Sequence, residues 1–442
     1  MRRVGTSASM ACAILACVAA GGGNALIAQN KPYTLTTLHD FTGGADGYEP
    51  TAALTIGPDG VLYGTTVLGG TSVCQMGCGT VFSMTQPAYG SGPWTETQLY
   101  VFQDGPIDGA NPFAGVTIAS GPDGRNALYG VTHYAGELNG GIAYELTPPA
   151  AAGGLWNEKV LYYFSGPDGY FPTGGLVAGS GGVLYGVTVQ NGSVSGVGTI
   201  FSLTPPAVHG GSWTHEVLYN FSTVSGGYNP IGKLVLGLGG ILYGAATLGG
   251  TNDAGTIFSL TPPVSPGNPW TYTELYSFLG GDDGSDPYAG MAMDKRGVLY
   301  GTTIFGGPSD DGTVFSLTPP SSPGGPWTHT VLYSFTGQAN GATANGGVII
   351  GPDGVLYGAD ATGGTVGGLC ADGCGTVYSL TPPATPGDDW TLTVLHRFTA
   401  KQGVYPASGL AMAADGSLFG TTESGGDFAC PFGCGTVYSL KR

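Results

Sequence analysis

Short apolar runs of five to nine residues, separated by turn-forming residues, recur along almost the whole chain. One period contains four of them, such as "GGVIIG", "VLYGAD", "GTVYSLT" and "WTLTVLHRF" between residues 346 and 398. Each run is rich in β-branched and aromatic residues, and Asp-Gly, Gly-rich or Pro-rich segments bound it. The pattern predicts four short β-strands in every period of an all-β protein.

Three markers show how often the period recurs. The triplet "LYG", or "LFG" in the last copy, returns every 56 to 66 residues. A run resembling "GTVFSLTPP" follows each triplet, and all six tryptophans open runs such as "WTETQLYVF". Seven copies of a four-strand unit predict a seven-bladed β-propeller. A solenoid is the alternative, but it requires polar terminal caps, and neither end of the chain carries a distinct capping unit.

The ends of the chain favour a closed ring. The last unit stops at "GTVYSLKR" and lacks a Trp-type strand, whereas the segment "YTLTTLHDF" at residues 33–41 is an isolated copy of that strand. Pairing the two segments removes two free sheet edges, which would otherwise invite aggregation. We therefore expect the N-terminal strand to complete the last blade.

The composite repeat "LYGTT…GG…GTVFSLTPP…WT.TVLYSF…DG..P.GGLV.G.DGVLYGTT" resembles the Gloeo/Verruco (GloVer) tandem repeat of exported bacterial proteins, often described as choice-of-anchor repeat proteins. The resemblance extends from Tyr33 to Leu440. It implies secretion and a repeat domain, and it implies no established catalytic activity.

The composition adds a cellular location and excludes one class of partner. Residues 1–28 have the layout of a secretory signal peptide, with two arginines, an apolar stretch and small residues beyond it. Residues 29–442 are then a single seven-repeat domain that is secreted, extracellular or periplasmic, monomeric, and free of transmembrane segments. Lipid anchoring through Cys17 is the alternative reading of the leader. The net charge of −17 argues against nucleic acid as a partner, because the chain would repel phosphates.

Three C-x-x-x-C pairs occupy the same place in the repeat, just before a "GTV" strand: Cys74 and Cys78, Cys370 and Cys374, Cys430 and Cys434. In an exported protein these spacings predict three local disulfides. A zinc site would need further ligands at suitable spacing, and a redox motif would have two intervening residues instead of three. We expect no metal and no cofactor.

Asp-Gly pairs recur before the first strand of a unit, and aromatic residues follow close behind. The topology places them on the same face as the cysteine loops. One hypothesis is a ligand-binding face that accepts sugar hydroxyls or cations; the alternative is that each aspartate shapes a turn by bonding N–H groups two residues on. The residues concerned are Asp46, Asp108, Asp168, Asp283, Tyr48, Phe113, Tyr170, Tyr228 and Tyr288.

No nucleophile, acid and base converge in the sequence, and we assign no catalytic residue. We expect an exported, non-enzymatic module that binds or scaffolds a polysaccharide or envelope component. The alternative is an extracellular hydrolase or lyase with its site on the loop face. That alternative draws on the second unit, where "HYAGELNGGIAYEL" breaks the repeat and places His133 four residues before Glu137.

Overall fold

The computed structural model describes residues 32–442 except 71–73, 88–91, 122–123, 150–155, 191–195, 209, 224–225, 266, 323, 369, 386 and 428–429. The expected signal peptide and Cys17 lie outside these residues. Residues Tyr33–Arg442 form one compact unit. Its regular structure consists of β-strands and short 3-10 turns.

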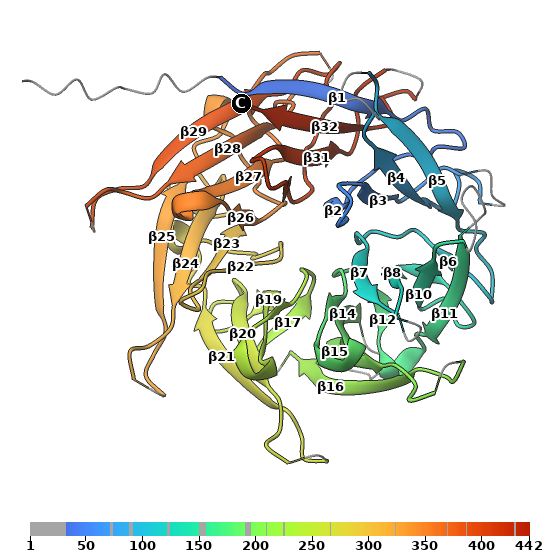
Figure 1. The fold of residues 1–442 in the computed structure, drawn as a ribbon. Helices are drawn as coiled ribbons and strands as arrows, with labels where there is room; N and C mark the ends of the chain where they lie inside the picture. The colour runs from blue at the N-terminus through green and yellow to red at the C-terminus, as the bar shows by residue number, and fades with distance from the viewer. Residues whose placement is uncertain are drawn as a thin grey trace, which may run out of the picture. The chain divides into compact units, whose positions relative to one another are not determined.

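Seven antiparallel sheets follow one another around a ring (Figure 1). In six of these sheets the strands lie side by side in chain order, and in the seventh the first strand of the chain lies beside the last. The first strands of neighbouring sheets contact each other at the inner edge of the ring. This arrangement confirms the prediction of a seven-bladed β-propeller with four-stranded blades.

The strands of the first four blades are β2 (Thr55–Ile56), β3 (Leu62–Thr66), β4 (Thr80–Thr85) and β5 (Thr95–Val101); β7 (Thr117–Ser120), β8 (Asn126–Thr132), β10 (Ile142–Thr147) and β11 (Asn157–Tyr163); β12 (Tyr170–Pro172), β13 (Val177–Ala178), β14 (Leu184–Gln190), β15 (Gly196–Thr204) and β16 (Thr214–Ser222); β17 (Gly227–Pro230), β18 (Val235–Leu236), β19 (Leu242–Gly249), β20 (Thr256–Thr261) and β21 (Thr271–Ser277).

The remaining blades contain β22 (Ala292–Met293), β23 (Leu299–Thr303), β24 (Thr313–Thr318) and β25 (Thr328–Ser334); β26 (Val348–Ile350), β27 (Leu356–Asp360), β28 (Thr376–Thr381) and β29 (Thr391–Arg397); β30 (Ala411–Met412), β31 (Leu418–Thr422), β32 (Thr436–Lys441) and β1 (Thr34–Asp40). A two-stranded ladder joins β6 (Gly109–Ala110) to β9 (Tyr134–Ala135). The 3-10 turns are η1 (Gly166–Asp168), η2 (Ser180–Gly182), η3 (Leu238–Gly240), η4 (Gly281–Asp283), η5 (Gln338–Asn340) and η6 (Pro352–Gly354).

The seventh blade is built from both ends of the chain, as predicted. Strand β1 pairs antiparallel with β32, and Figure 1 shows the first and last strands lying together. Phe41, just after β1, is 1% exposed and packs edge-to-face against Phe82 of the first blade, with ring centroids 5.3 Å apart. The closing strand therefore also ties the last blade to the first.

The core explains why "LYG" and "GTVFSL" recur together. The aromatic residue of the third strand is fully buried in the first blade as Phe82 and in the fifth as Phe315. Each ring lies over the glycine of the second strand: a β-carbon added to Gly64 would come within 2.4 Å of Phe82, and one added to Gly301 within 2.7 Å of Phe315. The glycine therefore makes room for the ring that fills the blade.

The tryptophans connect neighbouring blades. The ring of Trp156 in the second blade contacts Tyr63 of the first, and Trp94 of the first contacts Phe419 of the seventh. The same contact joins Trp327 to Tyr243 one blade back, at a centroid distance of 6.0 Å. The tryptophan and the tyrosine of "LYG" thus form a repeated contact between blades.

Candidate functional site

One side of the ring is formed by two sets of connections, and we call it the Asp–Gly face. The first set leads from the fourth strand of a blade to the next blade, at residues 41–54, 102–116, 164–176, 223–234, 278–291, 335–347 and 398–410. The second leads from the second strand to the third, at residues 67–70, 74–79, 133–141, 250–255, 304–312, 361–368, 370–375, 423–427 and 430–435. In antiparallel blades, alternate connections lie on the same side. The other connections form the opposite face.

The six cysteines of the described chain form three disulfides on this face: Cys74–Cys78, Cys370–Cys374 and Cys430–Cys434. The Cα atoms of each pair are 4.9 to 5.5 Å apart, within the range that a disulfide spans. Cys370 and Cys434 are fully buried. Met76 and Phe432, between the cysteines of two of the turns, are 64% and 65% exposed. The disulfides Cys74–Cys78 and Cys430–Cys434 therefore each close a turn that presents a large apolar side chain to solvent.

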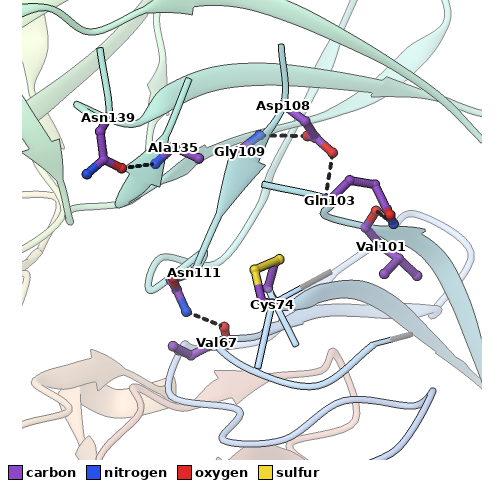
Figure 2. Close-up of a disulfide and its surroundings, with 10 residues drawn as sticks. Val67, Cys74, Val101, Gln103, Asp108, Gly109, Asn111, Ala135 and Asn139 are labelled. Carbon is purple, nitrogen blue, oxygen red and sulfur yellow. Dashed lines mark hydrogen bonds between the residues drawn. A yellow bond between two sulfur atoms is a disulfide. The ribbon is translucent and has the colours of Figure 1, made fainter. Parts of the chain in front are cut away.

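The aspartates of the Asp-Gly pairs make hydrogen bonds within their own connections. Asp108 is 6% exposed and accepts hydrogen bonds from the N–H groups of Gln103 and Gly109, beside the Cys74 disulfide (Figure 2). It also accepts a hydrogen bond from the hydroxyl of Tyr100. Asp283 accepts equivalent bonds from the N–H of Leu279 and the hydroxyl of Tyr276. The alternative interpretation placed each carboxylate on an N–H group two residues later in the chain. Asp108 and Asp283 instead accept most of their hydrogen bonds from groups that precede them in the chain.

Asp46 and Asp168 follow the same arrangement. Asp46 accepts hydrogen bonds from the N–H and the hydroxyl of Thr42, and His39 lies 3.2 Å from its carboxylate. These bonds lower the pKa of Asp46 against the opposing effect of burial. Asp168 accepts a hydrogen bond from the Ser165 hydroxyl at 2.9 Å and another from Tyr162. All four carboxylates organise their connections, so a ligand would compete with internal hydrogen bonds for them.

The expected aromatic residues divide into two groups. Phe113 and Tyr288 are 41% and 40% exposed. Tyr48, Tyr170 and Tyr228 are only partly exposed, and the hydroxyl of Tyr228 donates a hydrogen bond to Asp253. Of the five rings proposed for the binding face, Phe113 and Tyr288 are thus the two with exposed side chains.

Exposed apolar side chains nevertheless concentrate on the Asp–Gly face. Of thirteen large hydrophobic side chains exposed in the described residues, ten lie in its connections: Met76, Ile107, Phe113, Tyr134, Leu138, Leu279, Tyr288, Phe305, Val366 and Phe432. The other three, Val208, Leu238 and Val264, lie on the opposite face. Contiguous exposed apolar surface is what marks an interaction site, and on this face the exposed rings of Phe113 and Tyr134 contact the same imidazole, that of His133.

A compact aromatic cluster lies between the second and third blades on this face. The imidazole of His133 stacks on Phe171, with centroids 4.9 Å apart and planes 19° apart. Phe113 and Tyr134 approach the same imidazole edge-on at 5.1 and 4.6 Å. Three connections therefore bring four rings together, two of them exposed. Phe171 has a left-handed backbone with φ of 60°, a conformation that is rare for a bulky residue and that places its ring against His133.

His133 is poorly suited to acid–base chemistry with Glu137. Burial lowers the pKa of His133 to about 4, although a hydrogen bond with the carbonyl of Pro172 opposes the shift. Its Nδ1 has no hydrogen-bond partner among the described residues, and the Glu137 side chain is exposed. A general base works best with a pKa near the operating pH. The role that the structure supports for the His133 imidazole is therefore packing against the neighbouring aromatic rings.

A hollow of roughly 350 Å³ lies beside the aromatic cluster. It is lined by residues 104–106 and 135–139, which include the exposed Leu138, and the exposed Ile107 directly follows the first of these segments in the sequence. A second hollow of roughly 330 Å³ lies at the repeated Trp–Tyr contact between Trp156 and Tyr63, bordered by the first-to-second strand turns of the opposite face. The hollow on the Asp–Gly face is lined by small and polar residues together with the exposed side chain of Leu138, and no aromatic ring is among its lining residues.

The charge of the Asp–Gly face is predominantly negative around this hollow. Asp104 and Glu137 are exposed at its edge. Farther round the ring, Glu49 and Glu423 lie near each other in adjacent connections; burial raises the pKa of both, and the charge of Glu49 raises the pKa of Glu423 further. These charges disfavour an anionic ligand on the face.

Sequence reasoning missed Phe171, which completes the aromatic cluster, and Leu138, which lines the hollow. Phe171 could have been found in the sequence, because the residue just before the proline that follows an Asp-Gly pair occupies an equivalent turn position in the repeat.

Within the described residues, no three or more His, Cys, Asp or Glu side chains are arranged to hold a metal ion. No helix found there has the length and apolar character needed to cross a membrane.

The fold and the repeat define the chain as a seven-bladed β-propeller built from seven copies of one unit. The model of the Gloeobacter/Verrucomicrobia repeat family matches residues 18–194, 75–315, 126–368 and 263–442. The chain belongs to this family. No curated protein matches it.

Solved structures share the fold at low identity. A fungal alcohol oxidase of the AA5 family in complex with copper is 14% identical, with a TM-score of 0.53, over 92% of this chain and 75% of that one. PorZ, a surface component of the type-IX secretion system of Porphyromonas gingivalis, is 14% identical with a TM-score of 0.47, over 88% of this chain. This chain spans 46% of PorZ. The soluble aldose sugar dehydrogenase of Escherichia coli is 13% identical with a TM-score of 0.42, over 92% of this chain and 99% of that one. These likenesses show the fold alone.

Proposed function

We propose that this chain is an exported, non-catalytic binding module that holds a polysaccharide or envelope glycan against the Asp–Gly face. The observation that carries the proposal is the concentration there of ten of the thirteen exposed large hydrophobic side chains in the described residues. Export is supported by the layout of residues 1–28 and by the three disulfides. We further propose that the protein acts as a monomer.

The contact area proposed for the ligand is the aromatic cluster with the adjoining hollow. Exposed rings such as Phe113 and Tyr134 suit the apolar faces of sugar rings. Carboxylates at the edge, such as Asp104 and Glu137, can accept hydrogen bonds from sugar hydroxyls. The same carboxylates favour neutral glycans over acidic ones.

A glycan array probed with the purified protein, together with a panel of glycosidase and lyase substrates, tests the proposal. Binding to a neutral glycan is expected, and the variants Phe113→Ala and Tyr134→Ala are expected to weaken it about tenfold each, since an aromatic contact is worth about 1 kcal/mol or more. Leu238→Ala and Val264→Ala, on the opposite face, are the matched controls. Turnover that disappears in Glu137→Ala would establish an enzyme instead, and silence on every glycan would leave a structural role.

A further inference from the structure

The hollow on the opposite face lies where the first and second blades meet. Its volume is roughly 330 Å³, and the rings of Tyr63 and Trp156 are among the groups that line it. The two ring centroids are 6.3 Å apart and the ring planes meet at 65°, so the rings form two walls at a steep angle. The aliphatic walls come from Pro58, Ile118, Leu128 and Pro148.

A longer turn in the second blade leaves this hollow open. In four other blades, the turn between the first and second strands contains a glycine that lies against the proline following the third strand. A β-carbon on that glycine would lie 3.5 to 4.0 Å from the proline Cγ, in the pairs Gly182–Pro205, Gly240–Pro262, Gly297–Pro319 and Gly354–Pro382. The turn glycine of the second blade, Gly124, stands four residues before the leucine of "LYG" instead of two. Apart from its chain neighbours, no described heavy atom lies within 4 Å of its β-carbon position, and Pro148 lines the hollow instead.

Asp59 gives the hollow a negative charge. It lies in the turn between β2 and β3, where its Oδ1 accepts a hydrogen bond of 3.3 Å from the N–H of Val61. Burial raises the pKa of Tyr63, and the charge of Asp59 raises it further, so the carboxylate lies within electrostatic reach of the ring. Among the described residues that line the hollow there is no lysine or arginine, and Arg125, next to Asn126, is not one of them. A ligand with a positive charge would therefore be attracted here.

The two rings favour a cation that carries apolar substituents. The face of a tryptophan or tyrosine ring attracts a positive charge, and the attraction is larger when the cation is partly desolvated. A small, strongly hydrated ion would lose its water against the apolar walls of Ile118 and Leu128, whereas an alkylated ammonium can place its methyl groups there. The volume also falls within the range of small-ligand pockets, about 300–1,000 Å³.

We propose that this hollow binds a small organic ammonium ligand, with the alkylated nitrogen between Tyr63 and Trp156 and its charge paired with Asp59. The site lies on the face opposite the Asp–Gly face, so it does not depend on the glycan surface proposed above. In the six other copies the turn glycine stands two residues before the leucine of "LYG" or "LFG", so we expect one such site in each molecule.

A matched pair of ligands tests the role of the charge. Choline and 3,3-dimethylbutan-1-ol have nearly the same shape, but a carbon atom replaces the charged nitrogen in the second. Isothermal titration calorimetry at constant ionic strength is expected to show saturable binding of choline at one site per protein. The neutral alcohol is expected to bind about tenfold more weakly, because it lacks the attraction to the rings and to Asp59. Equal affinities, or no saturable binding of choline, would overturn the proposal.

Two pairs of variants locate the site. Asp59→Asn keeps the shape of the turn and is expected to weaken choline binding about tenfold, with little effect on the neutral alcohol. Asp353→Asn, in the same "PDG" turn of the sixth blade, is the matched control and is expected to change nothing.

Trp156→Leu is expected to abolish choline binding, whereas Trp270→Leu, which removes the tryptophan that contacts Tyr185, is expected to retain it. Circular dichroism confirms that each variant folds. Equal choline affinities of Asp59→Asn and Asp353→Asn would overturn the proposal even if Trp156→Leu failed to fold.

Discussion

Leu35 near the start of the described chain lies directly opposite Leu440, two residues from its end, in the antiparallel ladder of the seventh blade. Thr34 pairs with Lys441 and Asp40 with Thr436, so the ladder runs the full length of both strands. Because one chain end supplies the missing strand of the other, unfolding of β1 opens the ring.

Closure predicts that Phe41→Ala destabilises the whole ring. The Phe41 side chain is 1% exposed and joins β1 to Phe82 of the first blade, so truncation leaves a cavity between the first and last blades. The expected loss is about 3–5 kcal/mol in the free energy of unfolding, measured by urea denaturation. Phe113→Ala, at an exposed ring, is the control and is expected to cost little. Equal effects of the two changes would contradict the closure argument.

The disulfides predict an absence of free thiol. Cys74–Cys78, Cys370–Cys374 and Cys430–Cys434 are joined, so the denatured, unreduced protein without residues 1–28 is expected to give almost no thiol reaction. Replacing Cys370 and Cys374 together by alanine is expected to cost about 2 kcal/mol, the loop-closure entropy of so small a ring. Several reactive thiols, or stoichiometric zinc, would contradict the assignment.

Asp360 predicts an unusual pH dependence of stability. In four blades, two threonines that face each other on the second and third strands are joined by a hydrogen bond between their hydroxyls, as in Thr66 and Thr80. In the sixth blade Asp360 replaces the first threonine and accepts a hydrogen bond from the hydroxyl of Thr376. Asp360 is fully buried, its Oδ1 has no partner among the described residues, and burial raises its pKa well above the ordinary value. Above about pH 4 the unfolded chain loses this proton while the folded chain keeps it, so stability falls as pH rises towards the raised pKa.

The change Asp360→Thr tests this effect. It restores the threonine pair of the other blades and is expected to add about 1–3 kcal/mol to the free energy of unfolding near neutral pH. The gain is expected to shrink towards acidic pH, where the wild-type carboxyl is protonated in both states. Urea denaturation of both proteins across this pH range provides the measurement. A gain independent of pH would show that the carboxyl is not the cause.

Asp108 predicts a structural role for the Asp-Gly carboxylates. Asp108→Ala removes the acceptor for two N–H groups and the Tyr100 hydroxyl and leaves them unpaired. The expected cost is about 1–3 kcal/mol in unfolding free energy. Asp104→Asn changes an exposed carboxylate in the same connection and is expected to be nearly neutral. Full stability in Asp108→Ala, with loss of glycan binding, would instead make Asp108 a ligand-contacting residue.

Most of the fold can be predicted from the repeat in the sequence. Because "LYG" provides the glycine over which the Phe82-type ring lies, and the tryptophan reaches the tyrosine one blade back, each marker has a contact that requires it. Blade number and closure follow from counting such markers. Sequence alone could also place the cysteine and Asp-Gly connections on one side of the ring.

The candidate site is less visible in the sequence because it depends on side-chain direction. Tyr48 precedes the x-Pro dipeptide of its connection and Phe113 follows the one in the next connection, but neither position in the sequence tells which ring is exposed and which is partly buried. The stacking of His133 on Phe171 joins two connections that are far apart in the chain.

Hydrogen–deuterium exchange of the protein with and without a glycan selected from the array tests the central claim most directly. The account predicts that ligand slows exchange at residues 104–113 and 133–140 of the Asp–Gly face. It predicts no change at the turns 238–240 and 262–265 of the opposite face. Protection confined to the opposite face, including the hollow at Tyr63 and Trp156, would contradict the assignment of the Asp–Gly face as the binding surface.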